Sequence, residues 1–429
     1  MKHRNGAKSW IIFLFIVAFV VVTSSSGFTL DRQELLGTSN VISNQVDNCH
    51  LDREVRGVWL TNIDSDVLFS TENTTNAIAT LAELNFNTLY PTVWNWGYTL
   101  YPSAVAKQVT GRELDPTEGL HRRDVLQEII AQGHQKGMAV IPWFEFGFMA
   151  PADSELAKLH PEWLTQRADG STMWLEGKMH ERVWLNPLHP EVQKFITDLI
   201  VEIISNYDVE GIQLDDHFGY PSELGYDDYT VTLYQQEHNG KSPPPNSQDL
   251  AWIQWRADKI TNYMEELFQV IKKTNPQAIV SVSPQPKEIS LKSNLLDWPT
   301  WESQGLIEEL IVQIYRNNTN SFVNEITQPD LIAAKEHIPV SIGILSGLKG
   351  RPVLFDTIRQ QVAITRAGNF AGMSFFFYES LWNMTSESPE PRKDGLRALF
   401  KNPVARVDGS MSTVMIEQRG AESNSSPRL

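Results

Sequence analysis

The chain has 429 residues, 41% hydrophobic and 21% charged, a composition that excludes wholesale disorder and a many-span membrane protein. Its 52 acidic and 36 basic residues give a formal net charge of −16, so we expect no nucleic-acid partner. The single cysteine, Cys49, excludes internal disulfides and clusters ligated by several cysteines. The 13 tryptophans fit either a large core or flat platforms for sugar rings.

The N-terminus has the pattern of an export signal. Lys2, Arg4 and Lys8 precede an apolar run over 10–22, and small residues follow it. The run is shorter than the roughly 20 residues of a membrane-spanning helix, although an uncleaved membrane anchor remains the alternative. We therefore expect an exported protein of the periplasm or cell envelope, or a secreted one. Its expected parts are a signal peptide or anchor at 1–26, a linker at 27–52, a folded domain at 53–408 and a disordered tail at 409–429.

From residue 54 onward, short β-rich runs alternate with helical patterns. The expected strands cover 54–62, 88–94, 138–145, 211–216, 278–283, 310–315, 339–345 and 372–379. Helices are expected at 74–84, 122–136, 190–207, 250–273 and 356–366, with long insertions at 149–188 and 217–249, the second of them a loop. Eight such strands predict an α/β fold, a (β/α)8 TIM barrel with long βα-loop insertions. A doubly wound open sheet is the alternative, but it would usually carry a glycine-rich turn after its first strand, which 59–62 is not.

Alternation along the strands favours the closed barrel. In the fourth strand Ile212 and Leu214 alternate with Gln213 and Asp215, and the fifth, sixth and seventh strands show the same pattern. Strands of an open parallel sheet are covered on both faces and read as unbroken apolar runs. In a barrel the branched face packs on helices and the polar or small face points to the axis. Asp215 is therefore predicted to face the axis at the C-terminal end of its strand, where active sites of this fold lie.

An acidic side chain facing the axis is costly unless it has a partner or a task. We interpret Asp215 and Asp216 as catalytic carboxylates, with a loop cap or an arginine partner as the alternative. A metal site that includes His217 is a further alternative. We weigh against it because three consecutive residues on a strand cannot all face one ion, and no HxH or HExxH motif is present. We therefore expect neither a metal nor another cofactor.

A glycosidase normally needs a second carboxyl group. Strand ends offer Asp64, Glu145 and Glu379, and we prefer Glu145 because its apolar neighbours would raise its pKa toward that of a general acid. Polar and aromatic residues near the strand ends are the expected substrate contacts. They are Asn62, Trp94, Trp143, His217, Gln285, Gln313, Tyr315 and Glu379. Neither a GxSxG nucleophile elbow nor a GxxxxGK[ST] phosphate loop occurs in the sequence.

Five segments, 54–60, 84–90, 184–192, 207–217 and 313–315, together resemble the glycosyl hydrolase-like 10 family over residues 54–380. The resemblance implies a TIM-barrel glycosidase of the bacterial envelope, with Asp215 and Asp216 as the family's aspartate pair; some relatives are linked to peptidoglycan glycan processing. Two positions depart from the pattern. Family members often carry Asn where this chain has Glu145, and Trp where it has Arg316.

The sequence thus predicts a glycoside hydrolase that cleaves O-glycosidic bonds in an envelope or extracellular polysaccharide, with peptidoglycan glycan strands among the candidates. A non-catalytic carbohydrate-binding barrel is the main alternative, and a metal-dependent polysaccharide deacetylase is a more distant one. The expected partner is a glycan, and any membrane contact is expected through the N-terminus.

Overall fold

The computed structural model describes residues 52–177 and 179–407. The predicted signal peptide or anchor, nearly all of the predicted linker and the predicted tail therefore lie outside the described residues. Within the described part, no helix is both long and apolar enough to cross a membrane.

One parallel sheet forms the centre of the molecule, in the order β5-β2-β1-β16-β13-β12-β11-β10-β6. Its strands are β1 (Val55–Leu60), β2 (Thr88–Pro91), β5 (Ala139–Val140), β6 (Trp143–Phe144), β10 (Gly211–Asp215), β11 (Ile279–Ser283), β12 (Glu309–Gln313), β13 (Val340–Leu345) and β16 (Gly372–Phe376). The two ends of this order, β5 and β6, are separated in the chain only by Ile141 and Pro142. The Ile141 amide donates to the Leu89 carbonyl at 2.9 Å and the Gln213 amide to the Pro142 carbonyl at 2.8 Å. β5 and β6 are thus halves of one strand that closes the sheet, and the predicted eight-stranded barrel is confirmed.

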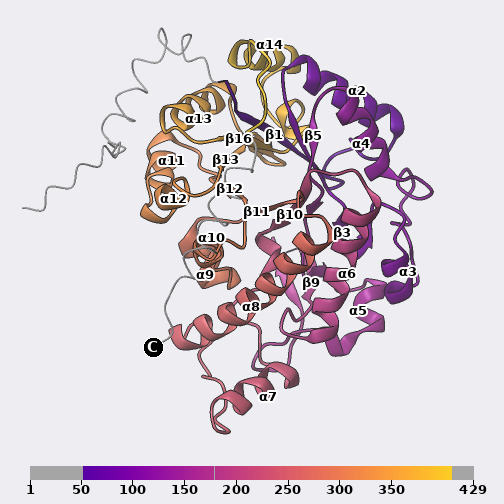
Figure 1. The fold of residues 1–429 in the computed structure, drawn as a ribbon, viewed down its shortest axis with the longest axis vertical. Coiled ribbons are helices and arrows are strands. Elements are labelled where there is room, and N and C mark those ends of the chain that lie inside the picture. Colours follow the sequence, from indigo (N-terminus) through magenta and orange to yellow (C-terminus); the bar gives the residue numbers. More distant parts are fainter. Residues whose placement is uncertain (1–51, 178, 408–429) are drawn as a thin grey trace, which may run out of the picture.

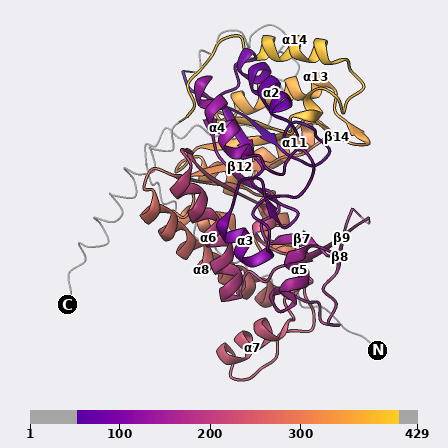
Figure 2. The ribbon, with the colours of Figure 1, turned by 90° about the vertical axis from the view of Figure 1, so that its right-hand side faces the viewer.

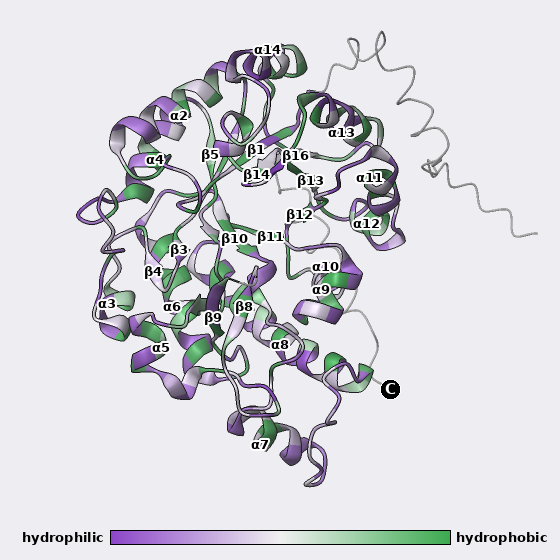
Figure 3. Ribbon diagram, turned by 180° about the vertical axis from the view of Figure 1, so that it is seen from behind, coloured by the Kyte–Doolittle hydropathy of each residue, from purple (hydrophilic) through white to green (hydrophobic). Residues whose placement is uncertain are grey.

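Helices surround the strands on the outside (Figure 1). They are α2 (Thr71–Glu83), α3 (Ala104–Thr110), α4 (Val125–Gln135), α6 (Pro190–Asn206), α8 (Leu250–Thr274), α9 (Lys287–Asn294), α10 (Trp298–Ser303), α11 (Thr319–Ile326), α12 (Pro329–Ala334), α13 (Phe355–Ala367) and α14 (Pro389–Leu399). The local reason is clearest in α6, where His189 caps the N-terminus, Pro190 occupies the first turn and one apolar stripe is buried. Figure 3 shows the matching mixture of hydrophilic and hydrophobic residues along the helices.

The two long insertions contain regular structure. The first carries α5 (Glu155–Leu159) and an antiparallel sheet of β7 (Met149–Pro151), β9 (His180–Trp184) and β8 (Trp174–Glu176), seen on one side of the molecule in Figure 2. The second was predicted to be a loop, and this is wrong, because it contains η3 (Asp216–Phe218) and α7 (Asp228–Glu237). α7 lacks a broad apolar stripe. The Asp227 side chain, which accepts from the Thr230 amide, and the packing of Tyr234 on Trp252 stabilise it instead.

Inside the barrel, aromatic side chains fill the space below the strand ends. Ile212 and Leu214 pack in the core with the helices, whereas the Gln213 side chain accepts from Trp59 Nε1 at 2.7 Å and donates to Ser281 at 3.0 Å. The predicted alternation of the fourth strand is therefore confirmed. The interior cluster consists of Trp59, Tyr90, Ile141, Trp143, Ile311 and Phe377. Gly57 makes room for it, since a Cβ there would lie 2.6 Å from the Tyr90 ring.

A buried ion pair closes the opposite, N-terminal end of the barrel. Glu309 begins β12, is 2% exposed and accepts from Ser281 at 2.8 Å and Tyr90 at 3.1 Å. Its other oxygen accepts from the guanidinium of Arg406, which also donates to Thr88 at 3.2 Å. The segment after α14 therefore supplies the counter-charge for an acid inside the barrel.

Replacing Arg406 tests whether its ion pair with Glu309 stabilises the fold. Arg406→Met should lower the free energy of unfolding by about 3 kcal/mol or more, because it leaves the Glu309 charge buried without its partner. The double variant Arg406→Met/Glu309→Gln should recover most of the loss, and equilibrium urea unfolding measures both. Equal stability of the single variant and the wild type would contradict the role given to Arg406.

Candidate active site

Two aspartates lie at the C-terminal end of the fourth barrel strand. Asp215 ends β10 and Asp216 begins η3, and they are 3% and 8% exposed. Gln313 Nε2 lies 2.8 Å from Asp215 Oδ1 and 3.4 Å from Asp216 Oδ1, while Gln285 donates to Asp216 Oδ2 at 2.7 Å. Burial, and then the neighbouring charge of Asp216, raise the pKa of Asp215 well above its ordinary value. Burial therefore favours the neutral form of Asp215 unless a nearby positive charge compensates its carboxylate.

His217 places a positive charge beside the two aspartates. Its Nδ1 lies 2.8 Å from the Glu145 carbonyl oxygen, 3.5 Å from Asp215 Oδ2 and 3.6 Å from Asp216 Oδ1. A carbonyl oxygen can only accept, so Nδ1 carries the proton. Burial alone would lower the pKa of His217, but the charges of Asp216 and Asp215 outweigh it and raise this pKa to about 10.

The loops after the third and fourth strands interlock around this histidine. The Phe148 amide donates to the His217 carbonyl at 2.9 Å, in the direction opposite to the bond from Nδ1 to Glu145. Gly147 has a φ of 49°, and a Cβ there would lie 2.3 Å from the same carbonyl oxygen. The two contacts fix the segment carrying Glu145 against the segment carrying Asp215.

Glu145 sits in a cradle of hydroxyl and amide donors and is 6% exposed. Its Oε2 accepts from Thr61, Thr92 and Asn95, each at 2.8 Å, whereas Oε1 accepts within the described residues from Thr61 alone, at 3.0 Å. Burial raises the pKa of Glu145 to about 7 despite these hydrogen bonds, which lower it. Oε1 is thus the oxygen with room for a proton, and Glu145 has the properties of a general acid.

The sequence analysis did not single out Thr61, Thr92 or Asn95. The available signal is their position, because Thr61 and Thr92 are the first residues after β1 and β2. Asn95 also donates to the Asn62 side chain at 2.8 Å, which brings Asn62, a predicted site residue, into the same network.

Of the predicted substrate contacts Tyr315 and Trp143, only Tyr315 has substantial exposed surface, since Trp143 is 2% exposed. Tyr315 is half-buried and stacks on Phe376 with ring centroids 5.4 Å apart. Burial, and then the charges of Asp215, Asp216 and Glu145, raise the pKa of Tyr315 well above its ordinary value. Trp143 belongs to the interior cluster directly below them.

Trp94 departs from the expectation that it faces the axis. Its side chain is fully buried, its ring packs on Phe195 of α6 at 5.5 Å, and its Nε1 donates to the Gly147 carbonyl at 2.9 Å. Trp94 opens the hairpin of β3 (Trp94–Asn95) and β4 (Tyr98–Thr99), which turns its ring toward the helices and Asn95 toward Glu145.

The two other candidate acids lie apart from the Asp215–Asp216 pair. Glu379, in η4 (Glu379–Leu381), accepts from Ser65 at 3.4 Å and from Asn383. Asp64 is exposed and lies 3.9 Å from Lys349 Nζ. Across the described residues, no hydrogen bond joins either acid to the aspartate pair.

Contrary to the expectation from the strand, residues 215–217 bring three potential metal ligands together. Ligand atoms of Asp215, Asp216 and His217 lie within 4.8 Å of one another, because the strand ends at Asp215 and η3 folds the next two residues back. The chemistry of the donors still does not fit an ion held through Nδ1, since that nitrogen carries the proton it donates to Glu145.

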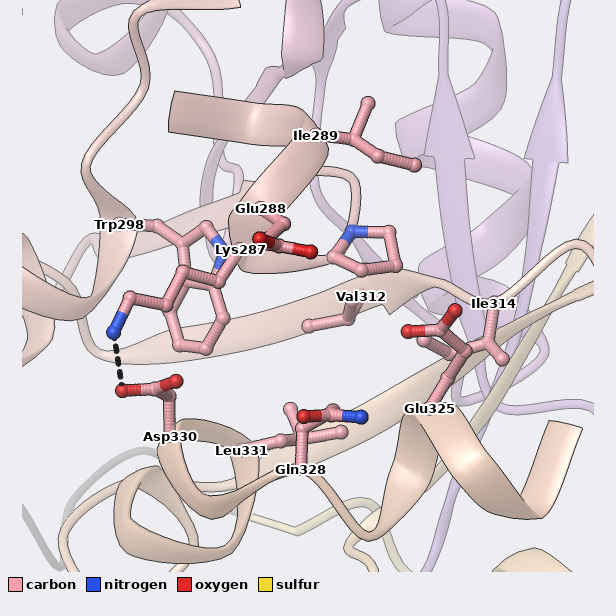
Figure 4. Close-up of a pocket in the computed structure, with 11 residues that line it drawn as sticks. Lys287, Glu288, Ile289, Trp298, Val312, Ile314, Glu325, Gln328, Asp330 and Leu331 are labelled. Carbon is pink, nitrogen blue, oxygen red and sulfur yellow. Dashed lines mark hydrogen bonds and ion pairs between the residues drawn. The ribbon is translucent and has the colours of Figure 1, made fainter. Parts of the chain in front are cut away.

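A separate cavity of about 280 Å³ lies on the helix side of the same strands (Figure 4). Val312 and Ile314 line it, whereas Gln313 between them contacts the aspartates. The ion pair of Lys287 and Asp330, 2.6 Å long, crosses its rim. Strand β12 thus separates this cavity from the carboxylates.

The barrel has a glycosidase-type fold, and three buried carboxyl groups lie at its strand ends. The chain belongs to the glycosyl hydrolase-like 10 family, whose profile matches residues 54–363. It is 22% identical over 318 residues to the glycosyl hydrolase YngK of Bacillus subtilis, covering 66% of this chain and 58% of the relative. It is 25% identical over 264 residues to the glycosyl hydrolase DigH of Escherichia coli (strain K12), covering 55% of this chain and 56% of the relative. The chain thus spans little more than half the length of these relatives.

A solved structure shares the fold. The catalytic domain of β-amylase from Paenibacillus polymyxa superposes with a TM-score of 0.57 at 9% identity, covering 82% of this chain and 99% of that domain. At this identity the likeness shows the TIM-barrel architecture.

The raised pKa of Glu145 predicts a pH-dependent cost in stability. Its pKa of about 7 in the folded protein exceeds the ordinary 4.5, so its contribution is fully present below pH 4.5 and is lost as the pH rises through 7. Between these pH values the wild type should lose up to ~3 kcal/mol of unfolding free energy relative to Glu145→Gln. Urea unfolding of both proteins at each pH measures this, with Glu265→Gln at an exposed position of α8 as the control. Parallel curves would show that the Glu145 carboxyl is not destabilised when charged.

His217 should remain protonated far above neutral pH. Its imidazole signals, followed by ¹H–¹⁵N NMR with the exposed His121 as internal reference, should show the doubly protonated ring at pH 8.5. In Asp216→Asn the pKa of His217 should fall by at least about one unit, because the carboxylate that does most to raise this pKa is removed. A neutral His217 ring at pH 8.5 in the wild type would contradict the charge arrangement described here.

Proposed function

We propose that this protein is an exported glycoside hydrolase that cleaves O-glycosidic bonds in an envelope or extracellular polysaccharide. The observation that carries the proposal is that His217 Nδ1 joins the backbone carbonyl of Glu145 to the aspartate pair at the C-terminal end of the barrel. Family membership and relatives named glycosyl hydrolases support it. The glycan strands of peptidoglycan are the substrate to test first.

In this proposal the carboxyl groups have different tasks. Glu145, with a pKa of about 7, donates a proton to the leaving glycosidic oxygen. Asp215 acts as nucleophile or stabilises the positive charge that develops on the sugar ring, an effect that is strong in a buried site. Asp216, held by Gln285, supports the charge, and Tyr315 offers a half-buried ring to a sugar.

Export rests on the basic and apolar N-terminal pattern of residues 2–22. Fractionation of the source cells should recover the protein outside the cytoplasmic membrane, soluble or tethered. Recovery in the cytosol with residues 1–26 intact would overturn this part of the proposal.

Asp215→Asn is the central test of the chemistry. The substitution keeps the side-chain size and removes the charge, so kcat on purified sacculi and isolated glycan strands should fall roughly 10²- to 10³-fold or more. Mass spectrometry of soluble sugar fragments measures the loss. Asp208→Asn, at an exposed turn after α6, is the matched control and should retain wild-type kcat.

The outcomes separate the alternatives. Fragments from the wild type with full activity in Asp215→Asn would overturn the assigned mechanism. Glycan binding without any fragments from the wild type would overturn the hydrolase and favour a carbohydrate-binding barrel. Glu145→Gln should slow natural glycans more than aryl glycosides, whose leaving groups need little protonation.

A further inference from the structure

The antiparallel hairpin of β8 and β9 begins beside the aspartate pair. Trp184 ends β9, and its ring centroid lies 5.6 Å from that of His217. The Nδ1 atom of His217 is in turn 3.5 Å from Asp215 Oδ2. Figure 2 shows β8 and β9 projecting from one side of the molecule. The base of the hairpin therefore lies one ring contact away from the histidine that borders Asp215.

The two faces of this hairpin have different environments. Side chains alternate between the faces along a strand, so Trp174 and Glu176 of β8 share one face and Leu175 takes the other. The cross-strand register places Arg182 opposite Trp174, and Glu181 opposite Leu175. Trp174, Glu176 and Arg182 are half-buried, whereas Leu175 and Glu181 are exposed. One face is therefore directed toward the protein and the other toward solvent.

Two series of ring contacts join the inward face of the hairpin to His217. The rings of Trp174 and Trp184 meet edge to face with their centroids 6.4 Å apart, and Trp184 contacts His217. The Arg182 guanidinium lies 5.1 Å from the centroid of the Phe146 ring, which is itself 6.1 Å from the His217 ring. The inward face of the hairpin therefore borders the site, further from the carboxylates than His217 is.

This inward face combines a flat ring with groups that can hydrogen-bond to hydroxyls. Trp174 keeps part of its surface accessible, whereas Trp184, which supports it, is 3% exposed. Glu176 accepts from Arg182 Nε at 2.8 Å, and 35% of the Glu176 side chain is exposed. Within residues 52–177 and 179–407 the Arg182 guanidinium donates no other hydrogen bond, so its terminal nitrogens keep their donors for a ligand. A sugar unit needs both kinds of contact, because its ring has apolar faces and carries hydroxyls at its edge.

We propose that Trp174, with the paired side chains of Glu176 and Arg182, forms a subsite for a sugar unit next to the one at Asp215. Trp174 stacks on the face of this sugar, and the paired side chains bind its hydroxyls. The inference rests on the proposed hydrolase and specifies its substrate class: a polymeric strand that extends beyond the bond that is cleaved. Binding energy from the distant unit positions the strand, so short oligosaccharides are poor ligands.

Affinity as a function of strand length tests the subsite without requiring turnover. The probes are a disaccharide and a longer strand of the same repeating unit, both prepared free of peptide from sacculi. Isothermal titration calorimetry gives the two affinities in full-length protein that carries Asp215→Asn, which slows consumption of the strand. The longer strand should bind at least roughly tenfold more tightly, because it alone reaches Trp174.

Variants assign the length preference to the hairpin. Adding Trp174→Ala should weaken binding of the longer strand roughly tenfold and leave the disaccharide unaffected, whereas Trp174→Phe should keep part of the preference because a ring remains. Glu176→Gln/Arg182→Gln should weaken binding of the longer strand alone. Leu175→Ala, on the opposite face of the same strand, is the matched control and should bind both probes as the parent does.

Equal affinity for the two probes would overturn the subsite, as would a length preference that persists in Trp174→Ala. Equal losses on both probes in that variant would overturn it too, because they would show a general effect on the site. These results are distinct from failure of the proposed hydrolase. Sugar fragments from the wild type without a length preference remove the subsite alone, and a length preference that depends on Trp174, without fragments, removes the hydrolase alone. Binding of neither probe would overturn the glycan-strand substrate and the subsite together.

Discussion

The site depends on one interaction, the imidazolium of His217 held between two aspartates and the Glu145 carbonyl. Without a positive charge at this point, three buried carboxyl groups would meet at the axis with only neutral donors around them. Such a cluster neutralises itself by taking up protons. The ring charge therefore opposes the uptake of protons by this buried cluster. The same ring fixes the acid-bearing loop, so geometry and electrostatics have a common origin.

The wider barrel serves this arrangement by limiting movement and solvent. Trp59, Tyr90 and Trp143 fill the interior beneath the carboxylates, and Gly57 provides the space that the Tyr90 ring needs. Gln213, fixed between Trp59 and Ser281, shows that even the polar positions of this layer are satisfied by partners. A packed interior of this kind gives the strand ends little freedom to shift.

Much of the fold was predictable because period-two alternation reports two different environments. Ile212 and Leu214 signal the helix side, and Gln213 and Asp215 signal the axis. The pattern fails where the chain leaves the strand. Trp94 lies in a hairpin that turns its side chain away from the expected direction. Asp216 and His217 fold back in a turn, so three consecutive residues can face one point, which an extended strand would not allow. Helix α7 was missed for a related reason, since its contacts are made by a cap and an aromatic pair. The hydrogen bonds of Thr61, Thr92 and Asn95 to Glu145 join residues from separate strands, so no local sequence pattern predicts them.

The two ends of the barrel differ in how far the charges of their buried carboxylates are compensated. At the N-terminal end, Glu309 receives a guanidinium and two hydroxyls, so its charge is fully compensated. At the C-terminal end, Asp215 accepts from the Gln313 side-chain amide at 2.8 Å and shares the His217 ring with Asp216 at 3.5–3.6 Å. A carboxylate whose charge is fully compensated by protein groups stabilises the fold but interacts weakly with a ligand. Incomplete compensation costs stability and leaves a strong field at the axis, which is what stabilisation of a positively charged sugar ring requires. The difference between these two ends is the physical reason for the role that we propose for Asp215.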